Sequence, residues 1–116
     1  MVDALLRRGD LVFIDFDPAR SFEAAAKRPA IVVSNNIANS VMHTVIVIPL
    51  TSGVSRVYPH ETFLPVHLSG LERDSKTQPH LLRHVSVGRV ERVLGHLDGD
   101  LMREVDEKLR EHLALG

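Results

Sequence analysis

Two basic residues, Lys27 and Arg28, stand directly before Pro29, where a polar and alanine-rich stretch meets an apolar run. An arginine at the start of a strand packs its aliphatic stem and presents its planar guanidinium, which suits two-point recognition of a phosphate. The alternative is an ion pair between Arg28 and Asp15 or Asp17, two carboxylates at the end of the preceding apolar run. The residues alone leave these two interpretations evenly balanced.

Two adjacent hydroxyl side chains, Thr51 and Ser52, follow the longest apolar run of the chain, Val45 to Leu50. Hydroxyl groups at the end of a strand can donate hydrogen bonds to a phosphate oxygen. More often such residues cap the turn that follows. Taken without other information, the turn-capping interpretation is favoured.

Seven histidines raise the question of a metal site: His43, His60, His67, His80, His84, His96 and His112. None of them forms the helical pair with a glutamate that zinc proteases use, and His80 and His84 fall on a predicted strand and its approach. The chain has no cysteine, which excludes disulfides, thiolate zinc sites and a thiol nucleophile. We therefore expect neither a metal nor a cofactor.

The size and composition are those of one ordinary globular domain. The chain has 116 residues, of which 44% are apolar and 25% charged, and this excludes disorder as the main interpretation. No apolar run is long enough to cross a bilayer, and the N-terminus lacks the charge order of a signal peptide. These features predict a cytoplasmic protein that does not bind a membrane.

The net charge of −1 is unevenly distributed along the chain. From Asp98 onward six acidic residues stand against three basic ones, which leaves a small positive excess on the rest of the chain. This distribution permits an anionic partner without requiring one, because an ordinary solvated surface explains it equally well.

The elements that must position the candidate residues are short. Alternating or continuous apolar residues predict strands over residues 11–16, 30–34, 44–50, 62–68 and 81–87, with the third buried on both faces. Pro65 interrupts the fourth strand, which indicates a sheet edge or a bulge. Residues 36–42 form a turn or one helical turn, residues 90–94 a short strand or helical turn, and residues 19–27 a mobile loop.

A helix of about four turns is predicted at the C-terminus, because Leu101, Val105, Leu109 and Leu113 recur at four-residue steps. Asp98 stands where an N-cap belongs. Several short strands followed by one helix predict an α+β fold that is mainly β, a strongly bent sheet or open barrel capped by the helix.

Four segments form a set: GDLVFIDFDP (residues 9–18), RPAIVVS (28–34), VIPLTS (47–52) and GLERDS (70–75). They resemble motifs of the MazF/PemK toxins, the ribonuclease components of type II toxin–antitoxin systems. Residues 97–113 are similar to the final amphipathic helix of that family. The first two motifs together are specific at this spacing, and the resemblance spans nearly the whole chain.

The resemblance implies an SH3-like barrel of about five to seven short strands with a C-terminal helix, in one domain that works as a homodimer. It implies metal-independent, sequence-specific cleavage of single-stranded RNA, above all mRNA, which inhibits translation and growth. It also implies control by a MazE-like antitoxin whose disordered acidic tail lies in the RNA groove. The catalytic arginine of the family falls on Arg28 and its threonine on Thr51. The candidate RNA-contacting residues are Ser21, Glu23, Lys27, Ser52, His80 and Arg83.

The sequence departs from the family pattern in two places. Ala24, Ala25 and Ala26 replace a glycine-rich loop, and alanine does not adopt positive φ angles cheaply. His80 and Leu81 replace an acid and a glutamine that hold bases in some members, so the cleavage motif cannot be transferred. A non-catalytic relative that binds a protein such as a topoisomerase, or nucleic acid, is the alternative; the presence of both the arginine and the threonine favours the enzyme.

Overall fold

The computed structural model describes residues 5–16 and 27–116. Its strands are β1 (Asp10–Asp15), β2 (Lys27–Val32), β3 (Thr44–Thr51), β4 (Phe63–Leu64), β5 (Ser75–Thr77), β6 (Arg83–Ser86) and β7 (Val90–His96). Its helices are α1 (Asn36–Val41), α2 (Val66–Ser69) and α3 (Gly99–His112), with the 3-10 turns η2 (Pro79–Leu81) and η3 (Val87–Arg89).

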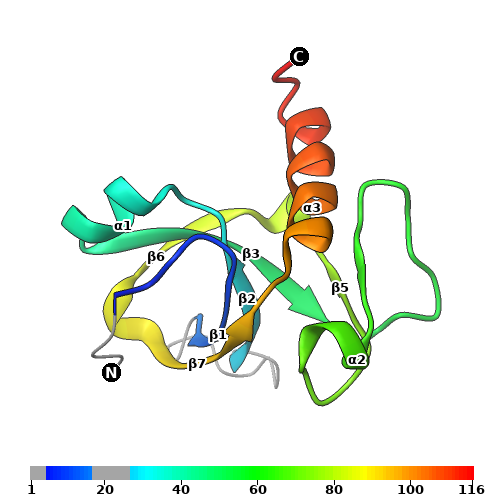
Figure 1. The fold of residues 1–116 in the computed structure, drawn as a ribbon, viewed down its shortest axis with the longest axis horizontal. Coiled ribbons are helices and arrows are strands. Elements are labelled where there is room, and N and C mark those ends of the chain that lie inside the picture. The colour runs from blue at the N-terminus through cyan, green and yellow to red at the C-terminus, as the bar shows by residue number, and fades with distance from the viewer. Residues whose placement is uncertain (1–4, 17–26) are drawn as a thin grey trace.

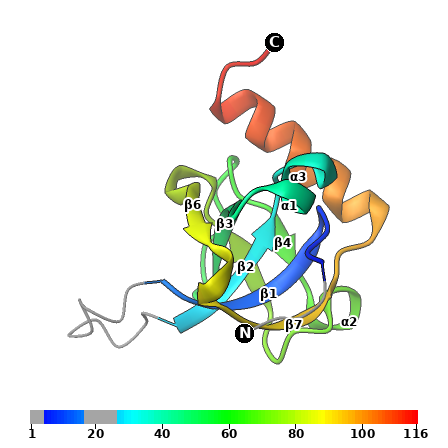
Figure 2. The ribbon, with the colours of Figure 1, turned by 90° about the vertical axis from the view of Figure 1, so that its left-hand side faces the viewer.

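The strands form one bent antiparallel sheet in the order β4-β5-β3-β2-β1-β7, and β6 pairs with the first half of β3 (Figure 1). The long helix α3 lies across the sheet and continues beyond it (Figure 2). This arrangement is the helix-capped half-barrel of the predicted α+β class. Within the described part of the chain, no helix has the length and apolarity that a membrane crossing needs.

The first three strands lie close to their predicted positions, with two differences. β2 begins at Lys27 rather than Ala30, because β1 pairs with it as far as Asp15 and Lys27. β3 is buried on both faces only in its second half; in its first half exposed Thr44 and Ile46 alternate with buried residues. The predicted loop over residues 19–27 lies outside the described residues, apart from Lys27.

The predicted strand over residues 62–68 is wrong in extent. Only Phe63–Leu64 pairs, as the edge strand β4, and Pro65 ends it and becomes the N-cap residue of α2. Proline fixes its own φ near that of a helix and has no N–H to pair, so the chain turns there into a helix. Gly70 closes α2 with a φ of 75°, a left-handed conformation that glycine adopts without strain.

The second half of the sheet also differs from the prediction. A strand that the sequence does not indicate, β5, lies in the polar stretch 71–79 and has three buried residues. The predicted strand over 81–87 is shorter, because Pro79–Leu81 form a 3-10 turn before β6. The two ambiguous segments resolve as the helix α1 and the strand β7.

Alternation along the strands divides the core into two layers. Val12, Ile14 and Val32 point into the half-barrel. Leu11 and Ile31 point to the other face, where Val105 of α3 covers them. Each fully buried side chain of this kind contributes roughly 1.5–3 kcal/mol to folding. The helix begins as predicted, with the Asp98 carboxylate accepting a hydrogen bond from the Leu101 N–H at 2.9 Å.

The Gly9-Asp10 pair of the first motif has a structural role. Gly9 has a φ of 95°, and a Cβ there would lie 3.0 Å from Cε1 of His96. The buried Asp10 carboxylate accepts a hydrogen bond from the Arg7 N–H at 2.8 Å and lies 2.8 Å from His96 Nδ1. The pair therefore ties the N-terminal segment to the end of β7.

Candidate active site

The start of β2 and the end of β3 lie beside each other, because the two strands are antiparallel neighbours. Their last paired residues are Ala30 and Pro49; Arg28 stands two positions before Ala30, and Thr51 stands two positions after Pro49. Beyond Pro49, β3 leaves β2 and pairs with β5, with Thr51 opposite Lys76. The sheet thus divides at this point, and Arg28 and Thr51 lie at the division.

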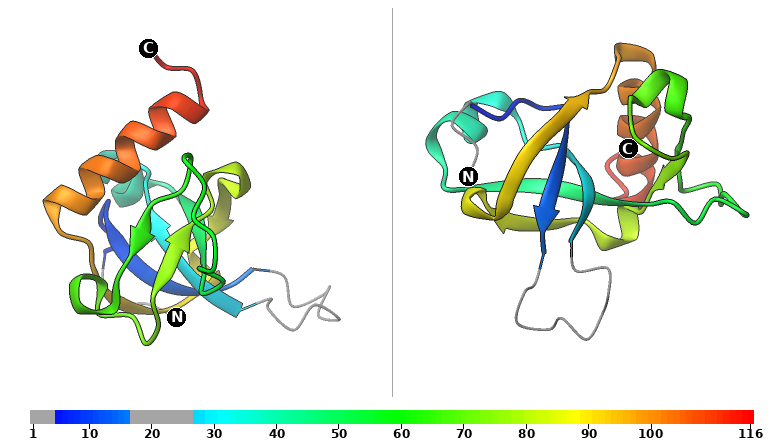
Figure 3. Two further views of the ribbon diagram at one scale, coloured as in Figure 1. Left: turned by 90° about the vertical axis from the view of Figure 1, so that its right-hand side faces the viewer. Right: turned by 90° about the horizontal axis from the view of Figure 1, so that it is seen from below.

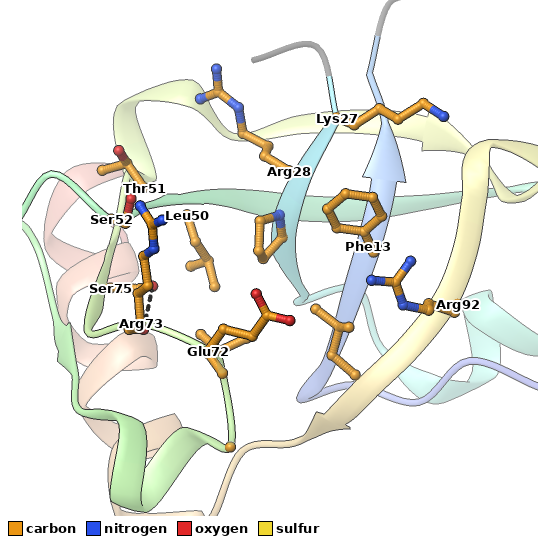
Figure 4. Close-up of a pocket in the computed structure, with 14 residues that line it drawn as sticks. Phe13, Lys27, Arg28, Leu50, Thr51, Ser52, Glu72, Arg73, Ser75 and Arg92 are labelled. Atoms are coloured by element: carbon orange, nitrogen blue, oxygen red, sulfur yellow. Dashed lines mark hydrogen bonds between the residues drawn. The ribbon is translucent and has the colours of Figure 1, made fainter. Parts of the chain in front are cut away.

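A cleft of about 740 Å³ opens at this division, and Figure 4 shows the side chains that line it. Four of them are basic: Lys27, Arg28, Arg73 and Arg92. Three carry hydroxyl groups: Thr51, Ser52 and Ser75. An apolar floor includes Phe13, Leu50 and Leu94. A cleft with this excess of positive charge attracts a polyanion.

The guanidinium of Arg28 is held by Gln78, the residue that follows β5. Its Nη1 donates a hydrogen bond to Oε1 of Gln78 at 3.3 Å, and Gln78 in turn donates its N–H to the Pro49 carbonyl at 2.9 Å. Asp15, one of the two ion-pair alternatives, lies opposite Lys27 in the β1–β2 register. The other, Asp17, lies outside the described residues.

Lys27 forms an ion pair with Glu91 of β7, with 3.0 Å between Nζ and Oε2. The hydrogen bond and the charge of Glu91 raise the pKa of Lys27 above its ordinary value, with a smaller contribution from Asp15. This lysine therefore keeps its charge at the rim of the cleft.

The Thr51 hydroxyl oxygen accepts a hydrogen bond from the Gly53 N–H at 3.3 Å, so it does cap the turn after β3. A hydroxyl that accepts one hydrogen bond can still donate its own hydrogen. The turn-capping and phosphate-binding interpretations are therefore compatible, and the cap fixes the position of the oxygen.

The remaining candidate residues are dispersed. Ser52 lines the cleft beside Thr51, whereas the structure places His80 and Arg83 outside its lining. The His80 ring lies against His60 with 5.5 Å between ring centroids, and the Arg83 guanidinium lies 5.4 Å from the centroid of the Phe16 ring. The other two candidates, Ser21 and Glu23, lie outside the described residues.

Several lining residues were not singled out from the sequence. Arg92 stacks on Phe13, its cross-strand neighbour, with 4.5 Å from the guanidinium carbon to the ring centroid. Glu72 and Arg73 reach the cleft from the turn between α2 and β5 (Figure 4). The GLERDS motif marks this turn, but only the fold shows that the turn faces Arg28.

The strand that pairs with Thr51 is anchored by a buried ion pair. Lys76 Nζ lies 2.9 Å from Oε1 of Glu61 and donates to the Arg56 carbonyl at 2.7 Å. The Tyr58 N–H donates to the same Glu61 oxygen at 2.8 Å. Burial acts to raise the pKa of Glu61, but the hydrogen bonds from the Tyr58 N–H and Lys76 outweigh it and hold the pKa below its ordinary value. This network holds residues 52–62, which extend beyond the sheet in Figure 3, against β5.

Among residues 5–16 and 27–116, no three histidine or acidic side chains gather in a way that could hold a metal ion. The cleft presents guanidinium groups and hydroxyl groups. Both stabilise negative charge on a phosphate.

Comparison with known proteins gives a consistent result. Residues 7–113 match the family model described as the PemK-like, MazF-like toxin of type II toxin–antitoxin systems. The chain is 36% identical to endoribonuclease MazF9 of Mycobacterium tuberculosis, over 96% of this chain and 98% of that protein. It is 32% identical to endoribonuclease EndoA of Bacillus subtilis, over 96% and 97%.

Solved structures agree on the fold. MazF from Deinococcus radiodurans superposes with a TM-score of 0.79 and 28% identity, over 97% of this chain and 99% of that chain. A MazE–MazF structure from the same organism gives a TM-score of 0.75 and 27% identity, over 96% and 97%. The resemblance that the motifs indicate is confirmed, and the chain belongs to the PemK-like, MazF-like toxin family of type II toxin–antitoxin systems.

Proposed function

We propose that this chain is a metal-independent endoribonuclease toxin that cleaves single-stranded RNA, mRNA above all, with Arg28 and Thr51 as its catalytic residues. The observation that carries the proposal is that both side chains line one basic cleft, Arg28 from the start of β2 and Thr51 from the end of β3. The related MazF9 and EndoA proteins, which are endoribonucleases by name, support the reaction class. The non-catalytic alternative is not favoured, because a pure binding protein needs neither residue at these positions.

The reaction is an attack of a ribose 2′-oxygen on the adjacent phosphorus. The new P–O bond forms as the bond to the 5′-oxygen breaks, the 2′-hydroxyl loses its proton, and the leaving oxygen gains one. The products are a 2′,3′-cyclic phosphate, or a 3′-phosphate after hydrolysis, and a 5′-hydroxyl. DNA lacks the 2′-hydroxyl and is not cleaved.

Negative charge builds on the non-bridging phosphate oxygens in the transition state. The Arg28 guanidinium stabilises this charge through two parallel hydrogen bonds, and the Thr51 hydroxyl adds a third donor. A guanidinium stays protonated in proteins, so charge stabilisation rather than proton abstraction is the role we assign to Arg28. Its hydrogen bond to Gln78 orients the group before RNA arrives.

The other candidate residues contact RNA away from the scissile phosphate. Lys27 and Ser52 line the cleft and bind flanking phosphates. Ser21 and Glu23, which the family resemblance indicates, complete this proposed RNA-binding set together with His80 and Arg83. The protein acts in the cytoplasm, where its mRNA substrate is translated.

A MazE-like antitoxin inhibits the toxin by competing with RNA. The four basic side chains of the cleft suit an acidic tail that imitates the phosphates. MazF of Deinococcus radiodurans has been solved together with MazE, which supports this partner class. Undiminished cleavage in the presence of saturating antitoxin would show that the two sites are separate.

The toxin works as a homodimer. Four large apolar side chains are exposed on α1 and the adjoining segment of β3: Ile37, Val41, Met42 and Ile46. One of them, Met42, also lines a hollow of about 330 Å³ together with Leu5. An exposed apolar surface of this kind marks a protein interface. Because the family resemblance implies a homodimer, we infer that a second copy of this chain covers it.

The test is cleavage of an unstructured RNA in EDTA by the wild type, Arg28→Ala and Thr51→Ala, with circular dichroism as the folding control. The proposal expects cleavage by the wild type, 5′-hydroxyl product ends, and severe loss in Arg28→Ala. A requirement for added metal would exclude the reaction class, and wild-type cleavage by a folded Arg28→Ala would exclude the mechanism.

A further inference from the structure

The cleft contains one group whose charge conflicts with phosphate binding. Among the described residues that line it, four are basic and Glu72 is the one acid. In Figure 4 its carboxylate points into the cleft, between the side chains of Arg73 and Arg92. Within the part of the chain that the structure describes, this carboxylate makes no hydrogen bond and no ion pair. A cleft built only to hold an RNA backbone would gain nothing from such a group.

The position of Glu72 is fixed by its neighbours even though its own side chain is exposed. Leu71 before it is buried in the core layer beneath α3. Ser75 after it is buried in β5 and donates a hydrogen bond to the Arg73 carbonyl at 3.0 Å. The Asp74 carboxylate accepts a hydrogen bond from the Val66 N–H at 2.9 Å and closes the turn against α2. The turn therefore presents Glu72 from a rigid support, as a recognition residue requires.

A carboxylate only accepts hydrogen bonds, and it repels phosphate oxygens. The groups of RNA that it can bind are those with N–H or O–H donors, and the nucleobases carry the N–H donors on their Watson–Crick edges. Guanine presents two adjacent donors there, its ring N1–H and its exocyclic amino group, which match the two oxygens of one carboxylate. A fixed carboxylate in a basic cleft is thus suited to read a base while the arginines hold the backbone.

We propose that Glu72 is a specificity-determining residue of the nuclease: it accepts hydrogen bonds from the Watson–Crick edge of a nucleobase next to the scissile phosphate, guanine being the best fit. This inference rests on the proposed RNA cleavage and adds a named role within that site. It assigns the discrimination between bases to the turn between α2 and β5.

The experiment compares the wild type, Glu72→Gln and Glu107→Gln on a pool of single-stranded RNAs with a randomised central segment, in EDTA, with the new 5′-hydroxyl ends sequenced. Glu107 is an exposed glutamate of α3 outside the cleft lining, so its substitution makes the same charge change as a matched control. We expect the wild type and Glu107→Gln to share one preferred base at a position near the cut. Glu72→Gln should lose discrimination at that position alone by about 5- to 150-fold, the range that a two-point base contact provides.

A second arm replaces the preferred guanine by inosine, which lacks the exocyclic amino group. The wild type should cleave the inosine RNA more slowly than the guanine RNA, and Glu72→Gln should cleave the two at similar rates. A purely structural role for Glu72 would not change this ratio, because loss of folded protein slows both substrates equally.

Three outcomes would overturn the inference. An unchanged cleavage motif in Glu72→Gln would exclude base reading. An equal loss on every RNA would exclude base reading and assign the carboxylate to the ribose, to proton transfer or to folding. If Glu72→Gln changed only the inhibition by the antitoxin and left the cleavage motif unchanged, Glu72 would contact the antitoxin and not the RNA base. Failure of the proposed function is distinct, because it would show as a wild type that does not cleave RNA in EDTA or as an active Arg28→Ala.

Discussion

The Lys76 ammonium and the Glu61 carboxylate form an ion pair of 2.9 Å in which both side chains are buried. Lys76 is also the cross-strand neighbour of Thr51. The position of the proposed catalytic hydroxyl is therefore connected, through one strand pair, to a buried charge pair. Removing a single partner of such a pair leaves the other buried and uncompensated.

Lys76→Met should therefore lower the free energy of unfolding by about 3–5 kcal/mol. The measurement is urea unfolding at neutral pH. Lys76→Met combined with Glu61→Gln should recover part of the loss, because no charge is then buried without a partner. A single Lys76→Met variant as stable as the wild type would show that the ion pair contributes nothing net.

The low pKa of Glu61 predicts acid sensitivity with a definite sign. Its folded-state pKa lies below the ordinary value of 4.5, so the folded state favours the ionised form. The stabilisation is complete at pH values above the unfolded-state pKa and disappears as the pH falls through the folded-state pKa. Melting temperatures followed from about pH 7 to about pH 3 should fall more steeply for the wild type than for Glu61→Gln. Parallel curves for the two proteins would contradict this assignment.

Arg28→Ala should reduce the rate of RNA cleavage on the order of 10²- to 10³-fold, by analogy with the loss of an oxyanion donor. Thr51→Ala should cost less, because one neutral hydrogen bond is weaker than a charged pair. Arg28→Lys should not restore the rate, since an ammonium lacks the planar fork. The measurement is single-turnover cleavage in EDTA, and full activity of the lysine variant would reduce the role of Arg28 to that of a point charge.

Met42→Asp should convert the homodimer into a monomer. Met42 and its neighbour Val41 are 58% and 67% exposed in the single chain, and a carboxylate buried at their interface would have no partner. Light scattering should give the 12.9 kDa monomer for the variant and twice that mass for the wild type. The matched control is Leu115→Asp, which changes another exposed apolar residue, near the C-terminus, and should remain dimeric. A dimeric Met42→Asp would move the interface elsewhere.

Local patterns were sufficient to predict the parts of the site that lie on regular strands. Apolar runs located β1 and β3, and the antiparallel pairing of β2 with β3 brings the start of one strand, with Arg28, beside the end of the other, with Thr51. The same reasoning failed for β5, because its residues are polar and show no apolar strand pattern. These residues are buried only because residues distant in sequence pair with their polar groups. Glu61 forms an ion pair with Lys76, and the Thr62 N–H donates a hydrogen bond to Thr77 Oγ1.

The rest of the cleft depends on tertiary structure in the same way. Glu72 and Arg73 stand in a short turn whose direction is set by the proline that ends β4 and by the helix α2. Arg92 became part of the cleft because β7 returns beside β1, a pairing between segments that lie far apart along the chain. The spacing of residues along the sequence predicts neither the direction of this turn nor the pairing of β7 with β1, because both depend on how the sheet closes.

The hydrogen bond from Arg28 to Gln78 allows a test of whether the orientation of the guanidinium affects catalysis. Gln78→Leu removes the Oε1 acceptor that lies 3.3 Å from the guanidinium but keeps the backbone N–H that donates to Pro49. The charge of Arg28 is unchanged, so RNA affinity and KM should stay close to those of the wild type. The rate constant kcat should fall, because a less oriented guanidinium stabilises the transition state less well, by roughly the 0.5–1.5 kcal/mol of one hydrogen bond or about 2- to 12-fold. Gln78→Glu should restore an oriented arginine and part of the rate. If KM rises while kcat stays constant, Gln78 contacts the RNA itself and does not act through Arg28.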